Sequence, residues 1–328
     1  MINIITYNIL SPARVNSREY LNYDPKYLDN NWRRDYIYNI IYSWVKSDAK
    51  PIIGLQEVPA PWKGQLEEIF LENGYRYFNM NYGKDKNAYF GTITAVPSIY
   101  EIKKVEYINV GDNIKPVSEE ELRQKINNDD GLVGFFKTFL TGKTYEDDEV
   151  DKVKKYKKEA DDRQNFATKL TLKKDFIFNY YNYHVPAAFE TPPVMIYHLD
   201  ALKRFICKDI YPSIWAGDFN SKPTSDEYRF LTEGVLPDKY KKELKEDYCE
   251  LKLISAFREV NRREPVFTLY SDTKFGGFFR DTIDYILYTP QLQAVDSRLL
   301  LYSNDKMPNK KNPSDHMPLF AQLKSSRI

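Results

Sequence analysis

The stretch SIWAGDFNSKP, residues 213–223, decides the fold predicted for this chain. It begins as an apolar run typical of a buried strand and ends on two polar residues, Asp218 and Asn220. A carboxylate is costly to bury unless it is paired, hydrogen-bonded or bound to a metal ion. The strand therefore ends either against partners from elsewhere in the chain or at a functional site.

A second apolar run, PIIGLQE (51–57), also ends on a carboxylate, Glu57. Apolar residues recur at helical spacing before both runs, over 31–48 and 192–207, and a further helix is predicted over 61–73. Because strands alternate with helices but also run in hairpins, the pattern predicts a mixed α/β layered fold. The other strands are predicted at 1–7, 89–97, 100–110, 165–173, 176–184, 282–289, 295–302 and 317–323.

Polar residues gather at the ends of these strands. Asn8 follows the first strand, His184 ends the strand at 176–184, and Asp315 and His316 precede the last one. Asp284 lies inside an apolar strand, where an unpaired charge is penalised, and His316 is a natural partner. Each residue alone is typical of a turn, cap or boundary position. Together they predict a site, since ligands of open α/β sheets bind at the carboxyl ends of strands.

The residue types at these strand ends indicate the chemistry. Carboxylates and asparagine are hard oxygen ligands, which favour Mg²⁺ or Mn²⁺ over zinc. A divalent ion combined with histidines is suited to neutralising a phosphate, while a carboxylate activates water.

Six motifs carry a resemblance to a known family. TYNIL (6–10), LQEV (55–58), NYH (182–184), GDFNSKP (217–223), IDYIL (283–287) and SDHMPL (314–319) occur in the order of the endonuclease/exonuclease/phosphatase superfamily. The resemblance implies a four-layer α/β sandwich, with two packed mixed sheets flanked by helices, as one domain over 1–328. GDFNSKPTSDEYRFLTEG resembles the deadenylase and nocturnin branch, and NYHVPAAFETPP looks closer to a poorly characterised algal, plant and viral branch.

The resemblance also implies a role for each residue of the set. The metal ion would be held by Asn8, Glu57 and Asp315. The catalytic residues would be His184, Asp218, Asn220, Asp284 and His316. Among these, Asp218 would orient or deprotonate water, Asn220 and the two histidines would contact phosphate, and Asp284 would hold the imidazole of His316.

Aromatic residues before IDYIL suggest a base platform. Deadenylases of the superfamily stack the terminal adenine on an aromatic residue at the position of Phe279, and Pro186 or Phe189 would form the other side. The alternative is that Phe275, Phe278 and Phe279 pack a loop onto the core.

Three basic residues are candidates for phosphate contacts. Arg163 precedes a strand that leads toward the site, where it either grips phosphate or forms a surface salt bridge. Lys310 and Lys311 lie in the loop before Asp315, which is either simply solvated or holds the flanking phosphates of a polymer. The one histidine outside the motifs, His198, lies on an apolar helix face and is interpreted as a core residue.

A charged segment at about 111–162 interrupts the pattern. Its acidic and basic residues nearly cancel, which predicts a solvated, partly helical insertion. Because long inserts often cover sites, a lid is the alternative.

Bulk composition limits the remaining options. The 328 residues carry a net charge of +1, so nucleic acid would have to bind through a local patch. No apolar run is long enough to cross a membrane, and neither a signal peptide nor a leucine-rich-repeat docking segment is recognised. Cys207 and Cys249 are expected to be free thiols, which favours a cytoplasmic location, and a monomer is expected.

The function predicted is a Mg²⁺-dependent phosphodiesterase that hydrolyses RNA, as a deadenylase-like 3′-exoribonuclease. One alternative is a nocturnin-like phosphatase acting on a 2′-phosphate or cyclic phosphate of a nucleotide. Another is an endonuclease or end-processing enzyme acting on DNA. A binding protein without catalysis is disfavoured, because every expected acidic and histidine position is filled.

Overall fold

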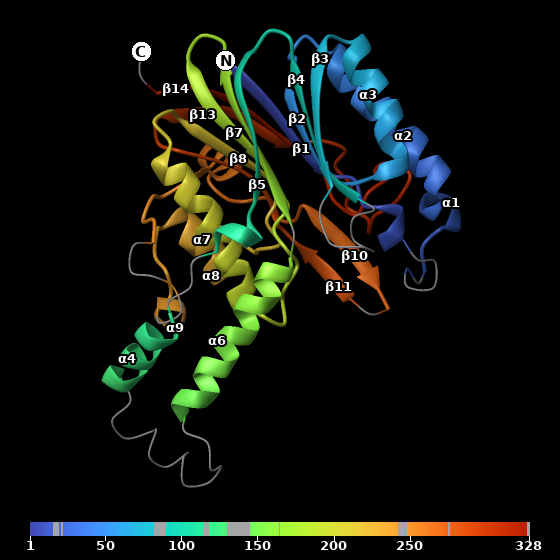
Figure 1. The fold of residues 1–328 in the computed structure, drawn as a ribbon. Helices are drawn as coiled ribbons and strands as arrows, with labels where there is room; N and C mark the ends of the chain where they lie inside the picture. Colours follow the sequence, from blue (N-terminus) through green and yellow to red (C-terminus); the bar gives the residue numbers. More distant parts are fainter. Residues whose placement is uncertain are drawn as a thin grey trace.

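Two six-stranded mixed sheets pack face to face, and helices lie outside them (Figure 1). This computed structural model describes residues 1–15, 20, 22–81, 90–114, 118–129, 145–163, 165–241, 244, 248–274 and 276–326. The arrangement confirms the predicted mixed α/β sandwich.

The first sheet has the order β13 (Leu292–Leu299), β14 (Leu319–Ser325), β1 (Ile2–Asn8), β2 (Ile52–Pro59), β4 (Phe90–Pro97) and β3 (Tyr75–Asn81). The second has the order β5 (Glu101–Asn109), β6 (Phe166–Lys173), β7 (Ile177–Asn182), β8 (Ser213–Asp218), β12 (Asp284–Tyr288) and β9 (Ile254–Ser255). A separate two-stranded ribbon consists of β10 (Leu269–Thr273) and β11 (Gly277–Asp281).

Burial on both faces explains the continuous apolar runs. Every residue of β2, β4, β8 and β12 is buried, as expected for strands covered on two sides. One apolar cluster lies between the sheets and includes Ile4, Ile52 and Ile214. Two further clusters lie between each sheet and its outer helices.

The first sheet is covered by α2 (Asn30–Lys46) and α3 (Lys63–Glu72), and the second by α7 (Pro192–Lys208) and α8 (Asp226–Thr232) (Figure 1). The short helices are α1 (Pro25–Leu28), α9 (Asp238–Lys241), α10 (Ala256–Asn261) and the 3₁₀ turns η1 (Pro12–Arg14), η2 (Ala60–Trp62) and η4 (Gly111–Asn113). The helix predicted from residue 61 begins at Lys63, because Ala60–Trp62 forms a 3₁₀ turn first.

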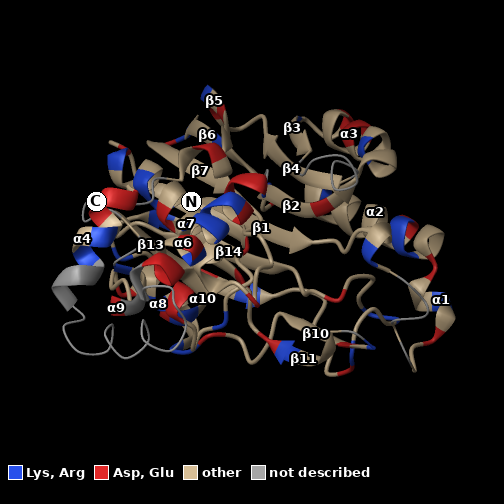
Figure 2. Cartoon of the chain, turned by 60° about the horizontal axis from the view of Figure 1, so that its bottom comes forward, with Lys and Arg blue, Asp and Glu red and all other residues tan. Residues whose placement is uncertain are grey.

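The charged segment contains α4 (Glu119–Asp129) and α6 (Tyr145–Asp162). These helices pack on each other through Leu122, Val150 and Val153, and α6 also contacts α7. Basic and acidic residues are interspersed over the helices, in keeping with the balanced charge of this segment (Figure 2). Residues 115–117 and 130–144 of the predicted insertion lie outside the described residues.

The prediction of two free thiols is wrong, because Cys207 and Cys249 form a disulfide. Their Cα atoms lie 6.3 Å apart, within disulfide range, although 42 residues separate them along the chain. Folding alone brings the end of α7 beside Cys249. The pairing removes the free-thiol argument for a cytoplasmic location. Among the described helices, none has the length and apolar character needed to cross a bilayer.

His198 is a core histidine, as predicted. It is fully buried on α7, with Nε2 3.1 Å from the carbonyl oxygen of Ala160 and Nδ1 2.8 Å from the hydroxyl of Tyr183. A carbonyl oxygen only accepts, so Nε2 carries the proton and Nδ1 accepts from Tyr183. Burial lowers the pKa of His198 to about 3, which keeps the ring neutral.

We expect His198 to make the fold sensitive to acid. An unfolded histidine takes up a proton near pH 6.5, whereas folded His198 does so only near pH 3. The unfolded state therefore binds one more proton in this window, so the free energy of unfolding falls by about 1.4 kcal/mol per pH unit as pH decreases. The free energy of unfolding, measured with urea between pH 7 and pH 4.5, should depend on pH less steeply in His198→Gln than in the wild type, by that amount. Equal slopes for the two proteins would contradict the expectation.

Candidate active site

A pocket of about 440 Å³ opens at the end of the sandwich. It lies where the carboxyl ends of two parallel strand pairs, β1 with β2 and β7 with β8, meet the ribbon β10–β11. Six of the eight predicted metal and catalytic residues line it: Glu57, His184, Asp218, Asn220, Asp315 and His316. The other two, Asn8 and Asp284, hydrogen-bond to lining residues from behind.

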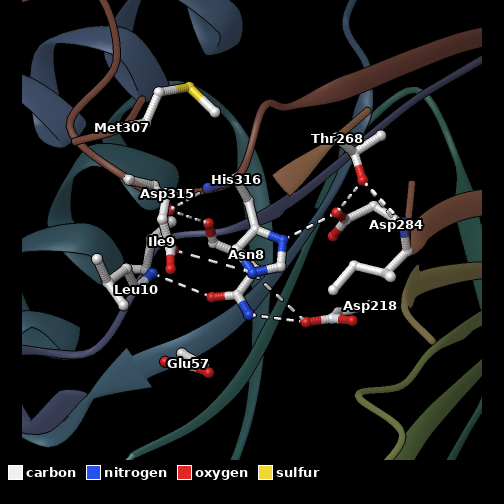
Figure 3. A network of polar contacts seen from close by, with 12 residues as sticks. Asn8, Ile9, Leu10, Glu57, Asp218, Thr268, Asp284, Met307, Asp315 and His316 are labelled. Atoms are coloured by element: carbon white, nitrogen blue, oxygen red, sulfur yellow. Dashed lines mark hydrogen bonds and ion pairs between the residues drawn. The ribbon is translucent and has the colours of Figure 1, made fainter. Parts of the chain in front are cut away.

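Asp218 is held on both carboxylate oxygens. Its Oδ2 accepts a 3.0 Å hydrogen bond from Nδ2 of Asn8 (Figure 3). Its Oδ1 accepts a 2.9 Å bond from the backbone N–H of Asn220. Antiparallel pairing of β8 with β12 places Asp284 directly opposite Asp218. Burial and the nearby Asp284 raise the pKa of Asp218, while His184 and His316 oppose the rise. A carboxylate with a raised pKa is a better proton acceptor for water.

His316 forms a buried pair with Asp284. Its Nδ1 lies 2.8 Å from Oδ2 of Asp284, which also accepts a 2.6 Å bond from the hydroxyl of Thr268 (Figure 3). Burial lowers the pKa of His316, but the carboxylates of Asp284, Asp218 and Asp315 outweigh burial and raise it to about 10. The imidazole is therefore cationic at neutral pH, and its Nε2–H, 3.7 Å from Oδ2 of Asp218, can donate into the pocket.

Asn220 and His184 form the opposite wall. Nδ2 of Asn220 donates to the carbonyl of Val185 over 2.7 Å and lies 3.2 Å from Nε2 of His184. Asn220 has a φ of 51°, a left-handed conformation uncommon outside glycine. Gly217, three residues earlier, allows β8 to lie close to the segment that follows β7, because a Cβ there would lie 1.9 Å from the carbonyl oxygen of Tyr183.

Glu57 reaches the pocket through an irregularity in β2. The pairing of β2 with β4 shifts register between Leu55 and Val58, and Glu57 has a φ of 57°. A bulge of this kind re-aims a side chain. Burial alone would raise the pKa of Glu57, but His184, Arg14 and the hydrogen bond from the backbone N–H of Ser11 outweigh it and lower the pKa. Glu57 is therefore ionised at neutral pH.

Asp315 is the residue that best tests whether this site fits a divalent cation. Its Oδ1 is buried and has no hydrogen-bond partner among the described residues, although Nε2 of His316 lies 3.9 Å away, and its Oδ2 is 3.5 Å from the hydroxyl of Tyr20. Burial raises the pKa of Asp315 to about 6; Glu57 adds to the rise, while His316 and Arg33 oppose it. A bound divalent ion would satisfy such an orphaned acceptor beside a second carboxylate.

Two groups of residues could hold that ion. Ligand atoms of Asp218, Asp284 and His316 all lie within 4.8 Å of one another. In that group, however, Oδ2 of Asp284 already binds Nδ1 of His316 and Thr268, and the imidazole is cationic. Glu57 and Asp315, with the Asn8 amide nearby, offer carboxylate oxygens that accept no hydrogen bond from the imidazole, since Nε2 of His316 lies 3.9 Å from Oδ1 of Asp315. This set fits the oxygen preference of Mg²⁺ or Mn²⁺ better.

The sequence reasoning missed Arg33, which ties together the segments that carry Asn8 and Asp315. Although its charge is buried, its Nε donates to the carbonyl of Pro313 over 2.6 Å, and its Nη2 donates to the carbonyls of Ile9 and Leu10. The helical spacing to Ile37 could have placed it on the buried face. Thr268, by contrast, lies in no motif, and nothing in the sequence signals its contact with Asp284.

Replacing Arg33 by lysine is expected to lower the free energy of unfolding by about 2–4 kcal/mol. Lysine lacks the planar fork that reaches these carbonyls, and each buried polar group left without a partner costs about 1–3 kcal/mol. The matched control is Arg34→Lys, whose side chain is 35% exposed beside Asp35 and whose loss should stay within about 0.5 kcal/mol. Denaturant unfolding measures the free energy of unfolding of both variants. Equal losses would refute the role of Arg33 in tying these segments together.

Only some of the predicted substrate-binding residues line the pocket. Pro186 and Arg163 line the pocket, and Arg163 forms a 2.9 Å ion pair with Glu159. Phe279 is half-buried on β11 and does not line the pocket. Lys310 and Lys311 are exposed on the loop before Asp315, away from the pocket lining. Phe275 lies outside the described residues.

Comparison with known proteins gives a consistent family match. Residues 5–316 match the model of the Endonuclease/Exonuclease/phosphatase family. The chain is 29% identical to human 2′,5′-phosphodiesterase 12 over 134 residues, 37% of this chain and 21% of that protein. It is 34% identical over 120 residues to carbon catabolite repressor protein 4 homolog 4 of Arabidopsis thaliana, 34% of this chain and 27% of that protein. The match thus spans about a fifth to a quarter of these relatives' length.

Solved structures agree on the fold. ANGEL2, a 2′,3′-cyclic phosphatase in complex with adenosine-2′,3′-vanadate, superposes with a TM-score of 0.68 at 17% identity, covering 98% of this chain and 95% of that one. The human nocturnin catalytic domain with bound sulfate superposes with a TM-score of 0.58 at 17% identity, covering 99% and 93%.

Proposed function

Because the chain belongs to the endonuclease/exonuclease/phosphatase family, whose members hydrolyse phosphoester bonds, we propose that it is a Mg²⁺-dependent phosphodiesterase that hydrolyses RNA from a 3′ end. The observation that carries this proposal is the pocket itself. It brings the orphaned Oδ1 of Asp315, the ionised Glu57 and the cationic His316 to one place. This combination suits a phosphate and a divalent ion.

Asn8, Glu57 and Asp315 would hold the ion. Mg²⁺, or Mn²⁺ as a substitute, would supply Lewis-acid neutralisation of the phosphate charge when bound there. The bonds to Asn8 and Glu57 from the backbone N–H groups of Leu10 and Ser11 orient these two side chains in advance.

The remaining residues would handle phosphate and protons. The Nε2–H of His316 donates to a non-bridging oxygen, and the carboxylate of Asp284 keeps the imidazole protonated and oriented. Asn220 and His184 contact the phosphate from the other wall. Asp218 accepts the proton of the attacking water, which its raised pKa favours.

RNA is preferred as the substrate because relatives that match over about a third of this chain are a 2′,5′-phosphodiesterase and 3′-5′-exoribonuclease subunits. The second candidate is hydrolysis of a nucleotide 2′-phosphate or cyclic phosphate. The superposition on a 2′,3′-cyclic phosphatase across nearly the whole chain favours it.

One activity panel with Mg²⁺ separates the candidates. It contains 5′-labelled oligo(A), RNA ending in a 2′,3′-cyclic phosphate, NADP and abasic duplex DNA. Shortening of oligo(A) from its 3′ end supports the proposal. If the protein only releases phosphate from NADP, or only opens the cyclic phosphate, the phosphatase function replaces the proposed one. If it only incises abasic DNA, the DNA-processing function replaces it.

Five residues are proposed to bind the substrate around the reacting phosphate. Phe279 would stack on the terminal base, with Pro186 opposite. Its register partner on β10 is Ser271, which lines the pocket, so Phe279 lies on the pocket side of the ribbon. Arg163 would contact a phosphate when released from Glu159, and Lys310 and Lys311 would attract the polymer.

Phe279→Ala is expected to raise KM for oligo(A) about 5- to 150-fold, since stacking one base is worth about 1–3 kcal/mol. Hydrolysis of bis-p-nitrophenyl phosphate, which has no base, should be nearly unchanged in the same preparation. Equal losses on both substrates would show that Phe279 is structural, and no loss on either would place the base elsewhere.

A further inference from the structure

The ribbon β10–β11 has two faces. Leu269, Ser271 and Thr273 line the pocket, so one face belongs to the site already described. The strands pair Tyr270 with Arg280 and Asp272 with Phe278, which places these side chains on the opposite face.

That opposite face carries a chain of aromatic rings. Phe278 contacts Tyr270 at 5.6 Å between ring centroids, Tyr270 contacts Phe267 at 5.5 Å, and Phe267 contacts Tyr302 at 6.4 Å. The two outer rings, Phe278 and Tyr302, are 67% and 53% exposed. Core packing does not explain two largely exposed aromatic rings at the two ends of this chain.

A cation lies within this aromatic chain. The guanidinium of Arg280 is 4.4 Å from the ring centroid of Phe267 and 5.3 Å from that of Tyr270. Arg280 is exposed and forms no ion pair with a carboxylate elsewhere in the described chain. The stacked guanidinium therefore keeps N–H groups available for an anion.

More positive charge borders the same face. The loop before Asp315 runs beside β10, where the N–H of Met307 donates to the carbonyl of Tyr270 over 2.9 Å. Lys306 of this loop lies 3.7 Å from Asp272 and so offsets the acidic residue on the face. We name Tyr270, Phe278, Arg280 and Tyr302, bordered by Lys306, the ribbon surface.

We propose that the ribbon surface binds single-stranded nucleic acid that extends out of the pocket. Exposed rings beside cations are suited to stacked bases joined by phosphates. A strand leaving the pocket reaches this surface within a short distance. Gly276, at the turn between β10 and β11, lines the pocket, and Phe278 follows two residues later. The proposal rests on the proposed function and deepens it, because it makes the substrate a polymer rather than a mononucleotide.

The test is a double variant, Phe278→Ala with Arg280→Ala. Its matched control is Tyr107→Ala with Arg298→Ala, which also removes one aromatic ring and one guanidinium. Tyr107 is a 45% exposed residue of β5, and Arg298 is an exposed residue of β13 whose guanidinium lies 4.5 Å from the ring centroid of Phe320 on β14. Thermal unfolding verifies that both variants fold. For 5′-labelled oligo(A) of about 20 nucleotides, kcat/KM should fall about 5- to 150-fold in the ribbon variant only. For a dinucleotide, kcat/KM should stay unchanged in both.

Binding of a fluorescent oligo(A) in EDTA tests the surface without turnover. The ribbon variant should bind more weakly and show a shallower dependence of log affinity on log salt, by about 0.7 for each phosphate that the variant no longer neutralises. Equal affinity in wild type, ribbon variant and control would overturn the ribbon surface, even if the enzyme degrades RNA. Absence of RNA hydrolysis with a selective loss of binding would instead reject the proposed function and keep the ribbon surface.

Discussion

Replacing Glu57 by glutamine is expected to lower kcat on oligo(A) by at least about 10³-fold at saturating Mg²⁺. A bound metal ion contributes several kcal/mol of stabilisation to the transition state, and each 1.36 kcal/mol is tenfold in rate. Glu57 is the ionised carboxylate that a β-bulge turns into the pocket that Asp315 also lines. A neutral amide in its place leaves the ion one charge short.

The matched control is Glu227→Gln on α8. Glu227 is buried to a similar degree, 7% exposed against 9% for Glu57, but does not line the pocket. It should retain near wild-type kcat. Thermal unfolding of the two metal-free proteins verifies that Glu57→Gln folds; because the fold lowers the pKa of Glu57, its charge stabilises the fold at neutral pH, and a modest decrease in unfolding temperature is expected. Full activity of the wild type in excess EDTA, or of Glu57→Gln with Mg²⁺, would refute metal-dependent catalysis at this site.

Asp284→Asn is expected to lower kcat by about 10²- to 10⁴-fold, and His316→Gln by a similar factor. A buried carboxylate that fixes an imidazole acts through that imidazole, and losing it permits the wrong tautomer. The two losses should therefore not add in a double-mutant cycle. Asp281→Asn on the neighbouring β11 is the control and should have little effect. Additive losses would show that Asp284 and His316 act independently.

The pH dependence of Asp284→Asn gives a second readout. The carboxylates raise the pKa of His316 to about 10, so the imidazolium is present below that pH and is lost as pH rises through it. A bound cation opposes this rise, so the alkaline limb of kcat should lie below pH 10 in the wild type. Without the charge of Asp284, the limb should move to lower pH. A limb at the same pH in both proteins would exclude His316 as its source.

The sequence predicted what depends on local pattern. Continuous apolar runs identified buried strands, helical spacing identified α2 and α7, and six ordered motifs identified the residues around the pocket. The polar ends of strands indicated the site because a buried carboxylate requires a partner. Asp284 and His316 could be paired on that argument, and the structure shows the pair; the hydrogen bond from Asn8 to Asp218 appears only in the structure.

Only the tertiary structure decided the contacts between distant segments. The bulge that turns Glu57 into the pocket arises from the register of β2 against β4, and no residue type signals it. Arg33 reaches Pro313 across 280 residues, and the Cys207–Cys249 disulfide forms because two ends of the fold meet. Phe278 and Phe279 are adjacent in sequence yet lie on opposite faces of the ribbon, because side chains alternate along a strand. The spacing along the chain determines which residues can form a strand or a helix, but pairing across the sheets determines which of them meet.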